Sequence, residues 1–133
     1  MVRDHRNLRV FHVADALTLD VYRATAQMSV DERFGLRAQV RRAAVSVATN
    51  IVEGATRPTV AEYCRFLNVA HGSARECEYL ASLAGRLAFV SRADASDLSK
   101  RYSALAASIY AAIRTLSAQG ERSFKPQAPR PKP

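Results

Sequence analysis

Residues 33–57 read RFGLRAQVRRAAVSVATNIVEGATR, and this stretch decides the fold. Its apolar residues recur at steps of three and four, which places them on one face of a helix: Leu36, Val40, Ala43, Val47 and Ile51. Small residues crowd its middle and would let a second helix approach closely. The pattern predicts a long helix over about 34–54. We expect Gly54 to end it, because glycine is favoured just after a helix C-terminus.

Three further helices are predicted from the same periodicity. They cover about 11–28, 59–90 and 94–119. The segments Ser29–Glu32 and Thr59–Glu62 have the capping-box pattern, in which Ser or Thr is followed three positions later by Glu at a helix start. Four helices with short connections predict an all-α fold, an antiparallel up-down-up-down four-helix bundle.

Glycines and surplus apolar residues mark the later helices. Gly72 and Gly85 each cost about 1 kcal/mol relative to alanine inside a helix, which a close helix contact or a kink would explain. Gly120 is expected to end the last helix. The third helix carries a second apolar line beside its main seam: Leu80, Leu83, Leu87 and Val90. A lone bundle needs only one apolar face per helix, so the extra surface predicts self-association.

The net charge of +8 is concentrated at the two ends of the chain. Residues 1–9 form a basic lead that we expect to be flexible, and residues 121–133 form a basic, proline-rich tail that we expect to be disordered. The bundle itself, residues 10–120, has 13 basic and 10 acidic residues. A basic balance favours polyanionic partners such as nucleic acid, although basic tails also simply improve solubility.

The cysteines and the hydropathy pattern indicate a cytoplasmic protein. Cys64 and Cys77 are separated by thirteen residues on one predicted helix, about 20 Å along its axis, so they cannot form a disulfide within one chain. We expect them to be core thiols in a reducing compartment. The sequence has no apolar run of membrane-spanning length and no secretory signal pattern, so no membrane association is expected.

Catalytic and metal-binding patterns are missing from the sequence. Metal sites in helical bundles use Glu-x-x-His pairs, and none of His5, His12 and His71 has a glutamate three residues before it. The glycines form no phosphate-binding loop. We therefore expect no catalytic residue, no metal and no cofactor, and a protein that is not an enzyme.

Arginines on the 34–54 helix are the strongest candidates for contact with nucleic acid. Arg33, Arg37 and Arg41 are spaced four apart, Arg42 lies beside them, and Arg57 follows the helix. Guanidinium groups in such a row would follow a phosphate backbone of RNA or DNA. The alternative is that they form ion pairs with three glutamates, within the chain or across a subunit interface: Glu53, Glu62 and Glu76. No aromatic residue interleaves with them in the sequence, so weak sequence specificity is expected.

Polar residues near the end of the same helix have a structural interpretation. Asn50 and Glu53 are expected to form a buried polar network that fixes helix register, with Gly54 as the cap. This interpretation is preferred to a functional one.

Two segments of the chain resemble the 23S rRNA-intervening sequence protein family, a family of four-helix bundles. The first match comprises Gly35-Leu36, Gln39, Arg41-Arg42-Ala43, Ser46, Asn50-Ile51 and Glu53-Gly54. The second comprises Glu62, Arg65-Phe66-Leu67, Ala70, Gly72-Ser73, Glu76 and Glu78. Family members usually carry proline where this chain has Ala48, so its helix is expected to be straighter.

The resemblance implies a small cytoplasmic bacterial protein that assembles into a ring, with a homopentamer as the expected form. Related basic bundles act as nucleic-acid-binding subunits beside reverse transcriptases, but the resemblance implies no known activity for this chain. The leading hypothesis is an oligomeric bundle that binds RNA or DNA through repeated Arg surfaces. The alternative is a structural or adaptor protein whose Arg residues contact neighbouring subunits or a protein partner.

Overall fold

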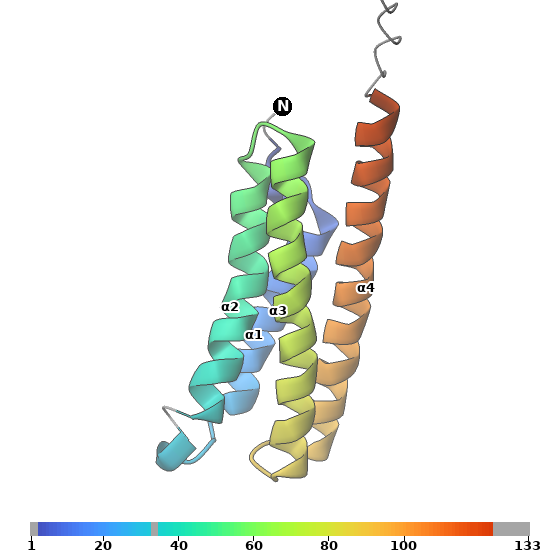
Figure 1. Ribbon diagram of the computed structural model, residues 1–133. Coiled ribbons are helices and arrows are strands. Elements are labelled where there is room, and N and C mark those ends of the chain that lie inside the picture. Colours follow the sequence, from blue (N-terminus) through green and yellow to red (C-terminus); the bar gives the residue numbers. More distant parts are fainter. Residues whose placement is uncertain (1–2, 33–34, 124–133) are drawn as a thin grey trace, which may run out of the picture.

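The computed structural model describes residues 3–32 and 35–123 of the chain, and these residues form helices and no strands. The four long helices are α1 (Arg9–Thr25), α2 (Leu36–Ala55), α3 (Val60–Arg86) and α4 (Arg92–Ser123), with short 3-10 helices η1 (His5–Asn7) and η2 (Val30–Glu32). Figure 1 shows successive long helices running in opposite directions beside one another. The predicted all-α fold with four helices is confirmed. Most of the predicted tail, residues 124–133, lies outside the described residues.

The core lies along the predicted seams of all four helices. Every residue of the seam that defines α2 is buried, from Leu36 to Ile51. The largest side chains with almost no exposed surface come from each long helix: Leu17, Val21, Val47, Ile51, Leu67, Cys77, Tyr102, Leu105 and Ile109. Burial of one such aliphatic side chain contributes about 1.5–3 kcal/mol, so the seams supply most of the driving force for folding.

The turn after α3 begins four residues earlier than predicted. The α3 helix ends at Arg86 rather than at about 90, because Ala88 adopts a left-handed conformation with φ of 60°. The Phe89 amide then donates to the Ala84 carbonyl at 2.9 Å, and the Ala88 amide donates to the Gly85 carbonyl at 3.0 Å. This is a helix-ending motif in which alanine occupies the position usually held by glycine. Ala88 itself is exposed.

The two predicted capping boxes have different outcomes. Thr59 caps α3 as predicted, since its hydroxyl accepts a hydrogen bond from the Glu62 amide at 3.2 Å. The Ser29–Glu32 segment instead forms η2, where the Ser29 hydroxyl accepts from the Asp31 amide. Glu32 then caps the next helix, because its carboxylate accepts from the Leu36 amide at 3.0 Å.

Neither predicted glycine stop ends its helix. Gly54 lies inside α2, which continues to Ala55, and it does not have the positive φ of a glycine cap. A Cβ atom at Gly54 would lie 3.0 Å from atoms of both Tyr63 and Phe66, so glycine is needed there for close packing against α3. The α4 helix likewise passes through Gly120 and ends at Ser123.

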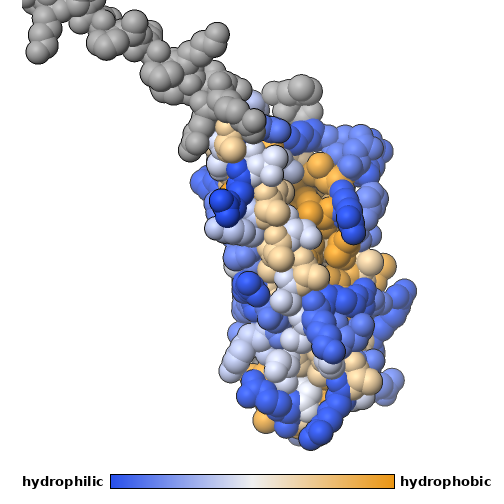
Figure 2. Space-filling view, turned by 90° about the vertical axis from the view of Figure 1, so that its right-hand side faces the viewer, coloured by the Kyte–Doolittle hydropathy of each residue, from blue (hydrophilic) through white to orange (hydrophobic). Residues whose placement is uncertain are grey.

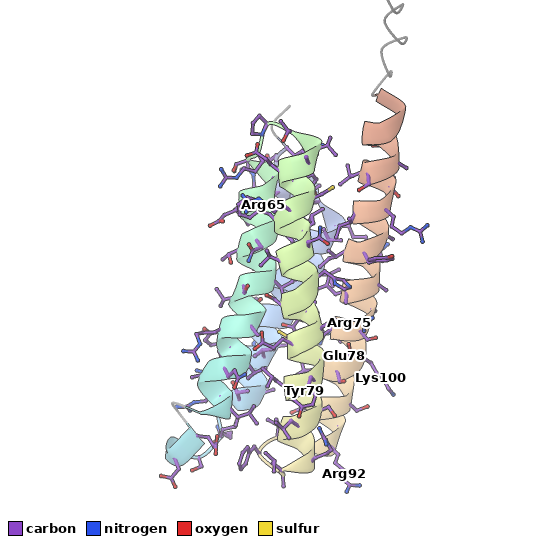
Figure 3. The ribbon with its side chains drawn as sticks, in the orientation of Figure 1. Arg65, Arg75, Glu78, Tyr79, Arg92 and Lys100 are labelled. Atoms are coloured by element: carbon purple, nitrogen blue, oxygen red, sulfur yellow. The ribbon has the colours of Figure 1, made fainter. Side chains whose placement is uncertain are left out.

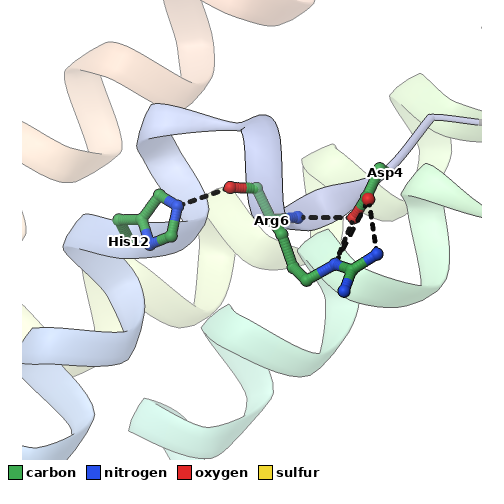
Figure 4. Close-up of polar contacts among 3 residues, drawn as sticks. All are labelled: Asp4, Arg6 and His12. Carbon is green, nitrogen blue, oxygen red and sulfur yellow. Dashed lines mark hydrogen bonds and ion pairs between the residues drawn. The ribbon is translucent and has the colours of Figure 1, made fainter.

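Residues 3–8 of the N-terminal lead lie against one end of the bundle. The Arg3 amide donates to the Ala55 carbonyl at 2.8 Å. The Asp4 carboxylate accepts from both the Arg6 amide and the Arg6 guanidinium, which lowers the Asp4 pKa to about 2 (Figure 4). His12 pairs with the Arg6 carbonyl at 2.6 Å. These contacts tie residues 3–8 to α1 and to the end of α2.

Two glycines of α3 should respond to alanine with opposite signs. A Cβ atom added at Gly72 would meet no atom of a neighbouring element within 4 Å in the described part of the chain, so Gly72→Ala should stabilise the fold by about 0.5–1 kcal/mol through helix propensity alone. At Gly85 a Cβ atom would lie 2.4 Å from the Ala95 Cβ, and overpacking of this kind costs about 1–3 kcal/mol. Urea unfolding of both variants measures the difference, and equal shifts would contradict the close α3–α4 contact.

Candidate nucleic-acid interface

Three of the predicted arginines meet in one groove between α1 and α2. Arg37, Arg41 and Arg42 project from the first half of α2, and Tyr22 of α1 forms part of the facing wall. The groove has a volume of about 490 Å³ and is completed by Ala38 and Val45. We call it the α1–α2 groove. The helical spacing thus places these cations together, as the sequence predicted.

Arg41 is held in place by the end of α1. Its Nε donates to the Thr25 hydroxyl at 2.8 Å, and its Nη2 donates to the Tyr22 carbonyl at 3.1 Å. Its guanidinium carbon lies 4.4 Å from the centre of the Tyr22 ring. Carbonyls in the last turn of a helix have no partner within that helix, so Arg41 completes the hydrogen bonding of α1. The first role of this arginine is therefore structural, and it also fixes a positive charge in the groove.

Arg37 and Arg42 have no carboxylate partner among the described residues. The ion pairs of that part of the chain involve four other arginines: Arg6, Arg23, Arg75 and Arg101. Pairing of the α2 arginines with glutamates of the same chain, which the sequence left open, is therefore not found there. Arg37 is half-buried and Arg42 is exposed. Their guanidinium groups are available to bind an anion.

The glutamates proposed as partners have other surroundings. Glu76 accepts a hydrogen bond from the Gln39 amide nitrogen at 3.4 Å, and the Glu62 carboxylate accepts from the Thr59 hydroxyl at 3.3 Å. Glu53 is exposed and does not line the groove. Among the described residues, the α1–α2 groove therefore has no acidic side chain in its lining.

Arg57 belongs to a different part of the molecule. It lies twenty residues beyond Arg37, about 30 Å along the helix direction, at the opposite end of α2. Its guanidinium carbon lies 4.6 Å from the Phe66 ring centre, and its Nε is buried without a hydrogen-bond partner in the described part of the chain. Arg65 stacks on the same ring at 4.6 Å, and Arg3 stacks on Tyr63 at 4.3 Å.

The five arginines predicted as one site therefore do not all lie together in the structure. Arg57 is not part of the α1–α2 groove, because the chain turns toward α3 before it. Arg33 lies outside the described residues. Three arginines remain as the candidate site.

Tyr22 lines the groove, but the sequence alone did not predict it as part of the site. No aromatic residue interleaves with the arginines along α2, but the fold brings Tyr22 of α1 against Arg41. Tyr22 directly follows buried Val21, so the α1 seam did place it at the edge of the core. Only the pairing of α1 with α2 could identify it as a neighbour of the arginines. It gives the groove an aromatic ring that is 42% exposed.

Polar side chains near the end of α2 form hydrogen bonds through two serines, while Glu53 is exposed. Asn50 donates to the Ser46 carbonyl at 2.8 Å and to the Ser46 hydroxyl at 3.1 Å. The Ser46 and Ser73 hydroxyls lie 2.8 Å apart, which links α2 to α3. Gly54 packs against the Tyr63 ring and the Phe66 Cβ, and these hydrogen bonds do not include Glu53. The hydrogen bonds of Asn50 thus stay within α2, and Ser46 makes the contact that crosses to α3.

Residues 3–32 and 35–123 contain neither a candidate metal site nor a helix suited to span a membrane. Histidine, cysteine and carboxylate side chains in those ranges form no group of three or more that could hold a metal ion. None of the helices there combines the length and the apolar character needed to cross a membrane.

Comparison with solved structures identifies the same architecture in another protein. The structure of a protein of unknown function from the S23 ribosomal protein family of Bacteroides thetaiotaomicron superposes with a TM-score of 0.70 at 20% sequence identity. The similarity covers 78% of this chain and 97% of that chain. At this identity the likeness establishes the fold alone. A search of curated proteins finds no match.

A family model matches nearly the whole described chain. The model is that of the 23S rRNA-intervening sequence protein, and it matches residues 6–122. This range includes all but the last residue of the four long helices, together with the α1–α2 groove and the Asn50 network. The chain therefore belongs to the 23S rRNA-intervening sequence protein family.

Proposed function

We propose that this protein is a non-enzymatic, oligomeric helical bundle that binds RNA or DNA through the α1–α2 groove. The observation that carries the proposal is the meeting of Arg37, Arg41 and Arg42 in one groove whose lining, among the described residues, contains no acidic side chain. Arginine binds phosphate through a planar fork of donors, which makes it suited to a nucleic-acid backbone.

The groove is partly organised before any ligand arrives. Arg41 is fixed by Thr25 and Tyr22, so its positive charge does not have to be ordered during binding. Arg37 and Arg42 supply the donors that are not used within the described part of the chain. Contacts of this kind go to phosphate and carry no base sequence directly, so binding should be weakly sequence-specific.

Self-association is the second part of the proposal, and a homopentamer is the expected form. Hydrophobic side chains gather in the upper half of the face in Figure 2. A groove between α1 and α4 is lined by four apolar residues together with Arg9, Arg101 and Ser108; the apolar residues are Val10, Val13, Ala104 and Leu105. Burial of apolar surface against a second copy would favour assembly. Each added subunit would repeat the α1–α2 groove, which increases the effective concentration of binding sites.

An adaptor role is the alternative function, and the surroundings of the same groove favour it. Leu19, Tyr22 and Val45 are exposed on the two helices that form the groove, with 51%, 42% and 37% of their surfaces accessible. Apolar anchors beside arginines are typical of protein-binding surfaces. An acidic protein or a neighbouring subunit would then contact Arg37 and Arg42.

The paired substitution Arg37→Gln/Arg42→Gln tests the binding proposal. We expect at least a tenfold loss of affinity for a labelled single-stranded RNA of about 20 nucleotides, measured by fluorescence anisotropy across a salt series. The dependence of log affinity on log salt should flatten by about one unit per lost phosphate contact. Glutamine preserves helix propensity, so helicity should be unchanged. Arg41 is left intact because it supports α1.

The control variant, Arg75→Gln/Arg114→Gln, removes the same charge from α3 and α4, away from the groove. Equal losses in both double variants would mean that net charge, rather than the groove, governs binding. Light scattering on the same samples reports assembly, and a stable monomer of 14.6 kDa would contradict the oligomer. A groove variant that loses its assembly instead of its RNA affinity would favour the adaptor role.

A further inference from the structure

We propose that a second groove, between α3 and α4, binds a short oligophosphate chain. This α3–α4 groove lies near the turn that joins the two helices and has a volume of about 440 Å³. Its lining includes three cations and three hydroxyls: Arg86, Arg92, Lys100, Ser82, Ser96 and Ser99. It lies on different helices from the α1–α2 groove, so the proposal does not depend on nucleic-acid binding there.

The floor of the groove is set by a close approach of the two helices at Gly85 and Ala95. A Cβ atom at Gly85 would lie 2.4 Å from the Ala95 Cβ, so the backbones of α3 and α4 are unusually near each other at this point. Further along, the Ser99 hydroxyl donates to the Glu78 carbonyl at 3.3 Å. These two contacts hold the walls in register. The side chains on either side of these contacts therefore form the walls of the groove.

Helical spacing directs the polar side chains into that space from both walls. Arg92, Ser96 and Lys100 are four residues apart on α4, and Ser82 and Arg86 are four apart on α3. Arg92 and Lys100 are separated by about 12 Å along the helix axis. Figure 3 shows both on the lower half of α4, beside the part of α3 that carries Glu78 and Tyr79. The cations thus occupy both ends of the groove and the serines lie between them.

Acidic side chains of the same helices are directed elsewhere. Asp94 and Asp97 of α4 line a separate groove on the α1 side, together with Asp20. Glu78 of α3 forms an ion pair with Arg75 at 2.8 Å. Among the described residues, no carboxylate lines the α3–α4 groove, and its three cations form no ion pair. The carboxylates at this end of α4 therefore lie toward α1, where Arg101 pairs with Asp20 and Asp97, and they do not neutralise the cations of the α3–α4 groove.

Linked phosphates match this arrangement in charge, hydrogen bonding and length. Each phosphate presents anionic acceptor oxygens to guanidinium and ammonium groups, and the Ser82 and Ser96 hydroxyls can donate to the same oxygens, whereas the Ser99 hydroxyl already donates to the Glu78 carbonyl. A short chain of linked phosphates places several such oxygens within the length of the groove. The described lining contains no aromatic ring, so it offers no platform for a base. The recognised group is accordingly the phosphate chain, either of a nucleoside triphosphate or of an inorganic oligophosphate.

Calorimetric titration of the full chain with sodium tripolyphosphate tests the proposal. We expect saturable binding that is weakened at least tenfold in Arg86→Gln/Arg92→Gln. Binding should be retained in Arg65→Gln/Arg114→Gln, which removes equal charge from the same two helices outside the groove and leaves the Arg75–Glu78 ion pair intact. It should also be retained in Arg37→Gln/Arg42→Gln. Ser96→Glu introduces a carboxylate while keeping all three cations, and it should weaken binding at least tenfold by repulsion.

The source of the phosphate chain is distinguished by parallel titrations with ATP and adenosine. Binding of ATP and tripolyphosphate without binding of adenosine supports a nucleotide phosphate chain, and binding of tripolyphosphate alone supports an inorganic chain. Absence of saturable tripolyphosphate binding to the wild-type chain would overturn the proposal. Equal weakening in all double variants, or unchanged binding in folded Ser96→Glu, would overturn it as well. Groove-dependent binding of single-stranded RNA without tripolyphosphate binding would assign the groove to a polymer instead.

Discussion

Tyr102→Ala is expected to lower the free energy of unfolding by about 3–5 kcal/mol, which is the usual cost of removing a large buried aromatic side chain. Tyr102 is the largest side chain with no exposed surface, and it lies on the apolar seam of α4. The substitution would leave a cavity between α3 and α4, whose lining can relax only partly. Single domains have a total stability of about 5–15 kcal/mol, so a large share would be lost.

Two variants isolate the cause of this loss. Tyr102→Phe keeps the ring and should cost far less than the alanine variant. Tyr110→Ala removes a tyrosine from the same helix about two turns later, but Tyr110 is 52% exposed and should change stability by less than about 1 kcal/mol. Urea unfolding at one fixed protein concentration measures all three, since assembly would make stability concentration-dependent. Similar losses at Tyr102 and Tyr110 would contradict the assigned burial.

The helical seams were predictable because burial and helix geometry impose one repeating pattern on the sequence. Leu36, Val40, Val47 and Ile51 are buried as expected, since they recur at helical spacing along α2. The same logic placed Thr59 at the start of α3. Local rules are sufficient where one helix face or one cap determines the outcome.

Glycine positions were predicted less well because their meaning depends on a distant partner. Gly54 has the sequence context of a helix stop, but its role is to let Tyr63 and Phe66 approach. Conversely, α3 is ended by Ala88, a residue with no sequence preference for a left-handed conformation. The tight α3–α4 turn and its two hydrogen bonds impose that conformation. The apolar spacing within one helix does not predict such a turn.

The candidate site was predictable only as far as one helix determines it. The spacing of Arg37 and Arg41 placed both on one face of α2. The hydrogen bonds from Arg41 to the end of α1 could not be predicted in the same way. Their acceptors belong to Thr25 and Tyr22, which lie sixteen or more residues away in the chain. The α3–α4 groove likewise combines side chains from two helices, so neither helix alone identifies it.

Alkaline pH should destabilise the fold through the buried pair Cys77 and Tyr102. Burial raises the pKa of the Cys77 thiol from 9.0 to about 12, and burial together with the neighbouring thiol raises the pKa of Tyr102 above its usual value of 10.0. Both groups are neutral when protonated. The folded chain therefore retains these protons at pH values where the unfolded chain has released them, and unfolding becomes more favourable as pH rises above about 9.

The expected size of the effect follows from the thiol. Each pKa unit corresponds to about 1.4 kcal/mol, so Cys77 alone should reduce the free energy of unfolding by about 2–3 kcal/mol between about pH 8 and pH 11. Tyr102 adds to the loss above about pH 10. Urea unfolding across this range, with a reducing agent present, measures the slope. Cys77→Ala should be less stable at about pH 8 because of its small cavity, but its stability should fall less steeply above about pH 9. Tyr102→Phe should flatten the curve above about pH 10. If both variants follow the wild-type slope, the alkaline loss arises from other groups and the Cys77–Tyr102 pair is not its source.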